Sequence, residues 1–150
     1  MATVKRKPHP VKQYKGKQGN FTESLEEFAG YAMEMATQIF RSVVIEVGSS
    51  VIRLSPVLTG QFKGNWALTI DTTYTQNTAP VDKEGQDTIN ELVRRAQSLN
   101  YGQTAYIVNN LPYGVPLEYG YSKKAPAGMV RITQARFQQI ISQAVEELAQ

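Results

Sequence analysis

The feature that most constrains the fold is a long amphipathic pattern that starts shortly after Phe21. Apolar residues recur there at the spacing of one helical face, at Leu25, Phe28, Ala32, Met35, Ile39, Val43 and Val47. Further apolar residues widen this stripe, so the helix can face both its own sheet and a second surface: Ala29, Ala36, Phe40, Val44, Val51 and Ile52. Ser24 and Glu27 match a capping box, and Pro56 disfavours helical geometry at Ser55. The sequence therefore predicts one long helix that ends near Leu54.

The remaining elements are shorter. Alternation of apolar and polar residues over 66–74 predicts a strand with one buried and one solvated face, and helical spacing returns between residues 82 and 100. Residues 105–109 are predicted to form a strand, with 113–119 as its hairpin partner across an Asn-Leu-Pro turn and Pro116 at an edge or break. A final helix is expected from Arg131 onwards. The predicted class is α+β, with a long N-terminal helix, a small antiparallel sheet containing a β-hairpin, a short middle helix and a C-terminal helix.

Charge divides the chain into two parts. Residues 1–20 carry no acid and six cations, whereas residues 21–150 hold ten basic and thirteen acidic side chains. We therefore expect a basic extended arm over 1–20 and a single α+β domain over 21–150, since 150 residues suit one core. The arm buries too little surface to fold alone, so it should become ordered only on assembly, against acidic faces of neighbouring subunits or against phosphates. Its cations are Lys5, Arg6, Lys7, Lys12, Lys15 and Lys17.

The sequence favours no catalytic chemistry. The chain has no Cys, which removes disulfides, thiolate metal clusters and cysteine nucleophiles, and its one histidine, His9, lies between two prolines in the arm. It contains neither a phosphate-binding P-loop nor a serine nucleophile elbow. Glu118 is a lone carboxylate beside aromatic residues, and we interpret it as a turn cap or interface group rather than a catalytic acid. We therefore predict no catalytic residue, cofactor or metal.

The sequence argues against two other classes of partner, membranes and single-stranded nucleic acid. The chain lacks an 18-residue uninterrupted apolar run and the pattern of a secretory signal, so we expect no membrane contact and assembly in a cytoplasm. Trp66 and several tyrosines could stack on single-stranded nucleic acid. Basic residues interleave with these aromatics only at Lys123 and Lys124, however, and Trp66 sits on the apolar face of its strand. A core or subunit interface is therefore the favoured interpretation.

Two segments of the sequence resemble a known family. The stretch SPVLTGQFKGNW, carried by Ser55, Pro56, Val57, Thr59, Gly60, Asn65 and Trp66, is similar to the "TPVDTG…S/N-W" segment of the tail-completion or neck proteins of long-tailed double-stranded-DNA bacteriophages. Residues 108–131 resemble the same family's "V-x-N-x-x-P-Y-A-x-x-L/I-E-x-G-x-S-x-x-A-P-x-G-M-V-R" segment. Both occur in the family's order, with a long helix before them and a helix after. The chain departs from the pattern at Leu58, where the family often has Asp, and at Gly114, where it often has Ala.

The resemblance implies a virion structural protein, not an enzyme. Members form a ring, usually sixfold, that joins head to tail between the head-closure or connector ring and the tail tube or its terminator, and surrounds the DNA channel. The close alternative is a tail-terminator ring, and a distant one is a nucleic-acid-binding protein that acts through the basic arm. An acidic body suits such a channel, because a wall of cations would condense onto DNA and hinder its passage. The neighbours of the ring and the direction of the arm stay open.

Ring formation requires apolar surface that identical neighbours can bury by heterologous contacts. We expect this interface on the long helix and the Trp66 face of the sheet, together with the motif around Glu118. The expected interface residues are Phe40, Val43, Trp66, Tyr113, Glu118 and Tyr119. Lys123 and Lys124, at the tip of loop 121–128, are expected to join the arm cations in contacting a partner or DNA.

Overall fold

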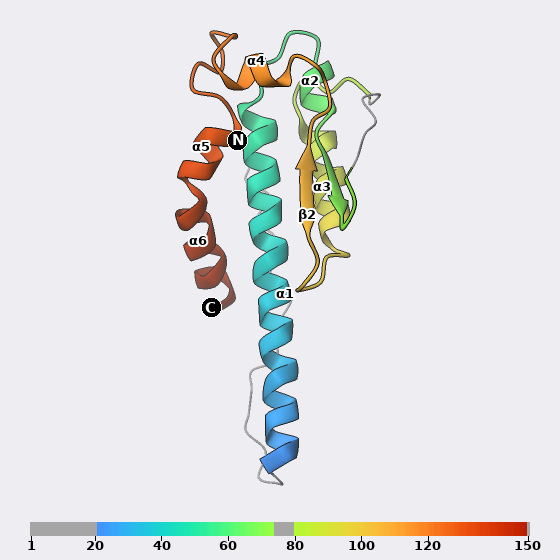
Figure 1. The fold of residues 1–150 in the computed structure, drawn as a ribbon, viewed down its shortest axis with the longest axis vertical. Coiled ribbons are helices and arrows are strands. Elements are labelled where there is room, and N and C mark those ends of the chain that lie inside the picture. The colour runs from blue at the N-terminus through green and yellow to red at the C-terminus, as the bar shows by residue number, and fades with distance from the viewer. Residues whose placement is uncertain (1–20, 74–79, 150) are drawn as a thin grey trace.

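The computed structural model describes residues 21–73 and 80–149 and has a mixed α+β fold, as predicted. Figure 1 shows one long helix with the shorter elements packed along its upper part. The elements in chain order are α1 (Phe21–Leu54), α2 (Gln61–Gly64), β1 (Ala67–Ile70), α3 (Gln86–Ala96), β2 (Ala105–Val108), α4 (Gly114–Glu118), α5 (Val130–Ala135) and α6 (Phe137–Ala149).

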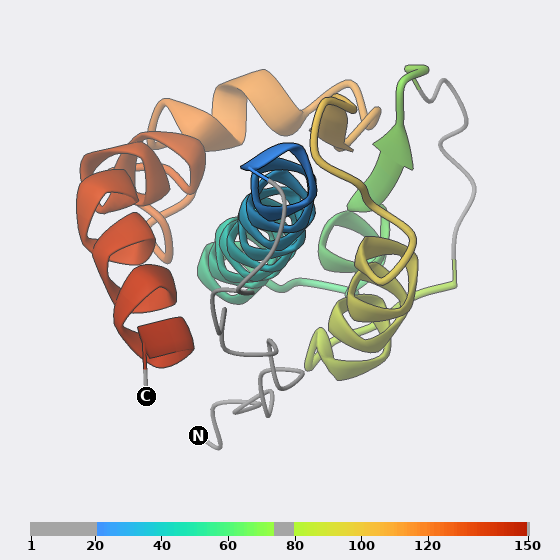
Figure 2. The ribbon, with the colours of Figure 1, turned by 90° about the horizontal axis from the view of Figure 1, so that it is seen from below.

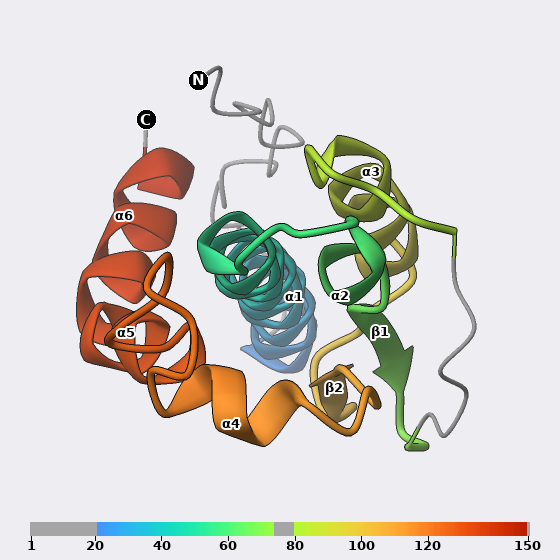
Figure 3. The same ribbon diagram turned by 90° about the horizontal axis from the view of Figure 1, so that it is seen from above.

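Helix α1 is the centre of the fold. Seen from below and from above, α5 and α6 lie on one side of it, and α3 and the strands lie on the other (Figures 2 and 3). Helix α4 connects the two sides at the upper end of the molecule (Figure 1). Its C-terminal half supplies Val44, Ile45, Val51 and Ile52 to the core, where they join apolar residues of α3 and β1. The predicted long helix is confirmed, and it is already helical at Phe21, the first described residue. Ser24 therefore lies inside the helix, and the predicted cap at that residue is wrong.

The N-terminal part of α1 projects beyond the other described elements (Figure 1). Residues 22–34 are exposed except for Ser24 and Tyr31, and Leu25 and Met33 are 51% and 50% exposed. Packing by other described elements begins near Thr37, whose hydroxyl accepts the N–H of Tyr101 at 3.2 Å. The helix therefore buries its upper half against the body and leaves much apolar surface on its lower half.

By length and composition, α1 could also cross a membrane. It contains an 18-residue window with a mean hydropathy of 1.2 and at most two charged side chains, although the sequence has no uninterrupted apolar run of that length. Of this window, 39% is buried inside the fold. A core helix of a globular protein passes the same test, so one such helix is weak evidence for a membrane span.

The sheet is antiparallel but differs from the predicted hairpin. Strand β2 pairs with β1, with Ala67 opposite Val108 and Ile70 opposite Ala105. Within β1 both Leu68 and Thr69 are buried, so the expected solvated face is absent from this strand. Thr69 tolerates burial because its hydroxyl donates to the carbonyl of Thr72 at 2.5 Å.

The residues predicted to complete the hairpin form a helix instead. Residues 114–118 make up α4, so the strand prediction for 113–119 is wrong. Pro116 fits this helix because it lies in the first turn, where its missing N–H has no intrahelical partner to lose. The predicted middle helix is confirmed as α3. The single C-terminal helix is in fact two, because α5 ends at Ala135 and the backbone leaves helical geometry at Arg136 (φ −94°, ψ 1°) before α6 begins.

Candidate assembly interface

The two segments that carry the family resemblance meet at one end of the molecule. The side-chain amide of Asn109 donates to the carbonyl of Phe62 at 2.7 Å, and the ammonium of Lys124 donates to the carbonyl of Val57 at 2.9 Å. The rings of Phe62 and Tyr113 lie 5.8 Å apart between centroids. Residues distant in sequence thus form one continuous structure above the C-terminal end of α1 (Figure 3).

The first segment is shaped by its own polar residues. The indole N–H of Trp66 donates to the Ser55 hydroxyl at 2.7 Å, and this hydroxyl donates to the carbonyl of Val51 at 2.6 Å. Gly60 has a φ of 89°, and a Cβ there would lie 2.6 Å from the backbone nitrogen of Lys83. The shared Ser, Gly and Trp of this motif therefore fix a tight turn between α1 and β1.

The second segment is organised by Glu118. Its carboxylate accepts the backbone N–H groups of Met129, Val130 and Arg131 at 2.8–2.9 Å, at the start of α5. The Arg131 guanidinium adds an ion pair at 3.2 Å and lies 4.8 Å from the centre of the Tyr119 ring. Burial opposes ionisation, but the hydrogen bonds from residues 129–131 outweigh it and lower the pKa of Glu118. Glu118 thus caps the start of a helix, whereas the capping role expected for it was at a turn.

Large apolar side chains are exposed around this end. Leu58 is 91%, Tyr121 85%, Tyr119 71% and Val115 69% exposed. Between the two segments lies an apolar groove of about 550 Å³, which we call the motif groove. Its walls include Val57, Leu58, Phe62, Tyr113, Leu117 and Tyr121, with Lys124 among the lining residues. A concave apolar surface with a cation suits the binding of another polypeptide better than a reaction.

The expected interface residues on α1 lie elsewhere. Phe40 and Val43 are partly buried and line a second apolar groove of about 440 Å³, which also includes Tyr101, Phe137 and Ile141. We call it the lateral groove. The structure therefore does not bring these two residues together with Glu118 and the tyrosines.

Trp66 has little surface to offer another subunit, since it is only 9% exposed and meets the ring of Phe62 edge-on with centroids 5.9 Å apart. Glu118 is also turned inward, with 15% of its side chain exposed. Tyr113, Tyr119, Lys123 and Lys124 are exposed at the motif end, as an interface requires. The arm cations, from Lys5 to Lys17, lie outside the described residues.

The sequence interpretation missed Leu58 and Val115 as surface residues, whereas Tyr121 belongs to the loop 121–128 that was expected to make contacts. Leu58 could have been found, because it is an apolar residue where the family often has an acid. Val115 was not singled out within the strand predicted over 113–119. Its exposure follows from the helix that replaces that strand.

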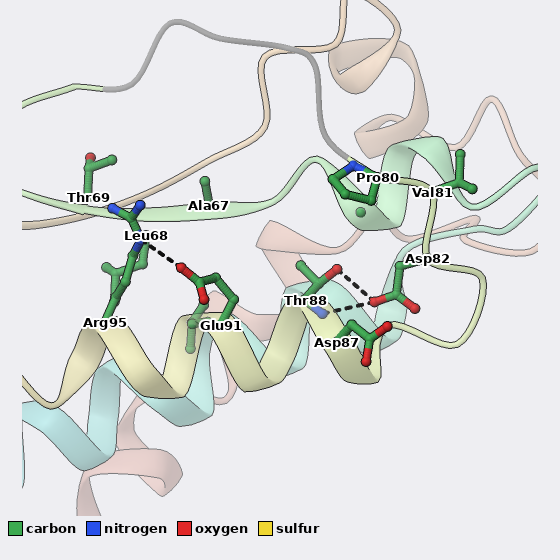
Figure 4. A pocket seen from close by; sticks show the side chains of 12 residues that line it. Ala67, Leu68, Thr69, Pro80, Val81, Asp82, Asp87, Thr88, Glu91 and Arg95 are labelled. Atoms are coloured by element: carbon green, nitrogen blue, oxygen red, sulfur yellow. Dashed lines mark hydrogen bonds and ion pairs between the residues drawn. The ribbon is translucent and has the colours of Figure 1, made fainter.

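A further pocket of about 280 Å³ lies between β1 and α3 and carries several charged groups (Figure 4). Asp82 accepts hydrogen bonds from the backbone N–H and the hydroxyl of Thr88 at 2.9 and 2.8 Å. It therefore caps the N-terminal end of α3. Hydrogen bonds from Arg94 and Arg95 lower the pKa of Glu91 to about 2. These carboxylates are ionised and engaged by neighbours, which suits them to structural roles rather than proton transfer.

Within residues 21–73 and 80–149, no group of three or more His, Cys, Asp or Glu side chains could hold a metal ion. Searches against protein-family models, curated proteins and solved structures found no match to the chain. The case for a function therefore rests on the two motifs and on the surface that they form.

Proposed function

We propose that the chain is a virion structural protein of a tailed bacteriophage, a subunit of a neck or tail-completion ring that joins head to tail. The observation that carries this proposal is the meeting of the two family-like segments at one end of the fold. Asn109 and Lys124 of the second segment bind carbonyls of the first, at Phe62 and Val57. Two motifs that match by chance need not fold onto one another.

The surface of that end supports a role in assembly. Tyr121, Leu58, Tyr119 and Val115 are each at least 69% exposed, and the motif groove lies among them. Exposed apolar patches on small proteins commonly mark protein–protein contacts. The polar groups of the same region are engaged within the chain, as Glu118 shows, so the end is rigid enough to present this surface.

Charge is consistent with a position around DNA. Residues 21–150 have a net charge of −3, which would let packaged DNA pass without condensing onto the wall. The expected partners are other copies of the chain, in a ring that the family makes usually sixfold, a connector or head-closure ring, and a tail tube or terminator ring. The basic arm could reach one of these rings or contact DNA.

The composition of separated particles tests the proposal. Mass spectrometry of purified virions, tail-less filled heads and head-less tails from the phage that encodes the chain should find it in virions at a small fixed copy number. Its absence from virions would reject the proposal.

The close alternative is a tail terminator, because both kinds of ring sit next to the tail tube. A terminator should be present in finished head-less tails, whereas a neck ring that joins at the boundary should be absent from them. A nucleic-acid-binding protein acting through the arm is the distant alternative, and it should be found in infected cells but not in particles.

A further inference from the structure

The projecting end of α1 and the motif groove near its other end differ sharply in charge. Residues 21–40 contain Glu23, Glu26, Glu27 and Glu34 and no Lys or Arg. The projecting part of the helix, residues 22–34, therefore carries a net negative charge and also exposes apolar side chains. The motif groove lies beyond the other end of the same helix and has the opposite character. Lys124 lines it, Lys123 is adjacent, and none of its described lining residues is acidic.

The apolar side chains of the projecting segment lie along one side of the helix. Successive residues are about 100° apart around an α-helix, which places Leu25, Ala29, Ala32 and Met33 on one face. Glu26 falls at the edge of this face, next to Met33. A segment docked by its apolar face would thus hold an acid at the rim of the surface that it covers.

We propose that the projecting segment of α1 in one copy docks into the motif groove of a second copy, with Leu25 and Met33 against the apolar wall and Glu26 facing Lys123 and Lys124. The contact cannot form within one chain, because the remaining 20 residues of α1, about 30 Å of rigid helix, separate the projecting segment from the motif end. It is heterologous, and contacts of this kind generate closed rings or open filaments. The proposal specifies which surfaces of neighbouring subunits meet in the proposed ring. It rests on the proposed function only for the expectation that copies of the chain assemble.

Charge selects the motif groove over the lateral groove. The lateral groove is lined by apolar and uncharged residues, including Phe40, Val43 and Phe137. It could accept an apolar helix face but offers nothing to Glu26 beside that face. The motif groove matches both features of the projecting segment, since apolar contact is joined by opposite charge.

Charge exchange in the full-length chain tests the pairing. Sedimentation velocity should show concentration-dependent self-association that weakens at high salt. The variants Lys123→Glu/Lys124→Glu and Glu26→Lys should each weaken association at least tenfold, and combining all three changes should restore it. Because Lys124 also binds Val57 within the chain, Lys123→Glu alone is measured as well and should weaken association in the same direction. Arg94→Glu/Arg95→Glu, which makes the same change of charge on the exposed face of α3, should leave it unchanged.

Crosslinking gives an independent test, because the chain has no native cysteine. One tagged chain carries Leu25→Cys and a second, of different size, carries Leu58→Cys. A bismaleimide should join them into a mixed dimer, and should not join Leu25→Cys to a chain with Phe137→Cys in the lateral groove.

Three results would each overturn the proposal. They are a monomer at every concentration, failure of the three-residue exchange to restore association, or crosslinking to Phe137→Cys in place of Leu58→Cys. None of them bears on whether the chain is found in virions, so failure of this contact is distinguishable from failure of the proposed function.

Discussion

Glu118 and Arg131 are linked through both backbone and side chain: the amide and the guanidinium Nε of Arg131 reach the same carboxylate oxygen of Glu118, at 2.9 and 3.2 Å. The second oxygen accepts the amides of Met129 and Val130. A single carboxylate therefore ties the end of α4 to the start of α5 and holds the loop between them. The loop carries Tyr121, Lys123 and Lys124, so the shape of the motif groove depends on this link.

Replacing Glu118 by Gln should leave a folded, soluble protein that is less stable. Gln has one acceptor oxygen and no charge, so at least one of the amides at 129–131 loses its partner, at a cost of about 1–3 kcal/mol. Urea denaturation monitored by circular dichroism measures this loss. Glu91→Gln is the matched control: Glu91 is half exposed in its ion pairs, so the change should cost under about 1 kcal/mol. Equal effects of the two changes would contradict the capping role.

The contribution of Glu118 should depend on pH. Its pKa is lowered in the folded protein, so folding favours the ionised form. The stabilisation is complete above the unfolded pKa of about 4.3 and is lost as pH falls through the lower folded value. The difference in unfolding free energy between wild type and Glu118→Gln should therefore be constant above about pH 6 and shrink below about pH 4. A difference that grows on acidification would contradict the sign of the shift.

Trp66 should report directly on the core beneath the first motif. It is the single tryptophan of the chain and is 9% exposed, so its emission should be blue-shifted and move to the red on unfolding. Trp66→Phe removes the donor to the buried Ser55 hydroxyl and should destabilise the protein by about 1–3 kcal/mol. Tyr121→Phe, at an 85% exposed position, should change stability by less than about 0.5 kcal/mol. A Trp66→Phe protein as stable as wild type would place Trp66 outside the core.

Gly60 and Gly30 should respond in opposite directions to substitution by Ala. Gly60 has a positive φ, and its Cβ would collide with the backbone at Asp82 and Lys83, so Gly60→Ala should cost more than about 1 kcal/mol. Gly30 lies inside α1 with nothing within 4 Å of the added carbon, so Gly30→Ala should stabilise by about 0.5–1 kcal/mol. Thermal denaturation of both variants measures the contrast, and a Gly60→Ala protein with an unchanged melting temperature would refute the argument.

The sequence predicted the elements whose patterns extend over many residues. Helix α1 shows its apolar spacing over eight turns or so, and α3 shows it over three, so both were placed correctly. The hairpin failed because residues 113–119 are short and mix Gly, Pro and aromatic residues, and such a segment has no periodicity to separate strand from helix. The true partner of β2 is β1, and α3 lies between them in the chain, so a local pattern could not reveal their pairing.

The candidate site was predicted in part. Tyr113, Tyr119, Lys123 and Lys124 lie exposed at one end, whereas Phe40 and Val43 line a different groove and Trp66 is a core residue. An apolar side chain on one face of a helix can belong to the core or to an interface. Which of the two it joins depends on how far the other elements extend along the helix. The other described elements pack along α1 only as far as about Thr37, and no local pattern in the sequence of α1 indicates this limit.

The most direct test of the central claim is electron microscopy of lysates from a phage carrying an amber mutation in the gene for this chain, with complementation by the wild-type gene as control. A neck or tail-completion ring predicts filled heads and separate tails of normal length that do not join, and joined virions when the gene is supplied. Tails of irregular length would favour the terminator alternative. Normal, joined and infectious virions without the chain would contradict the proposed function.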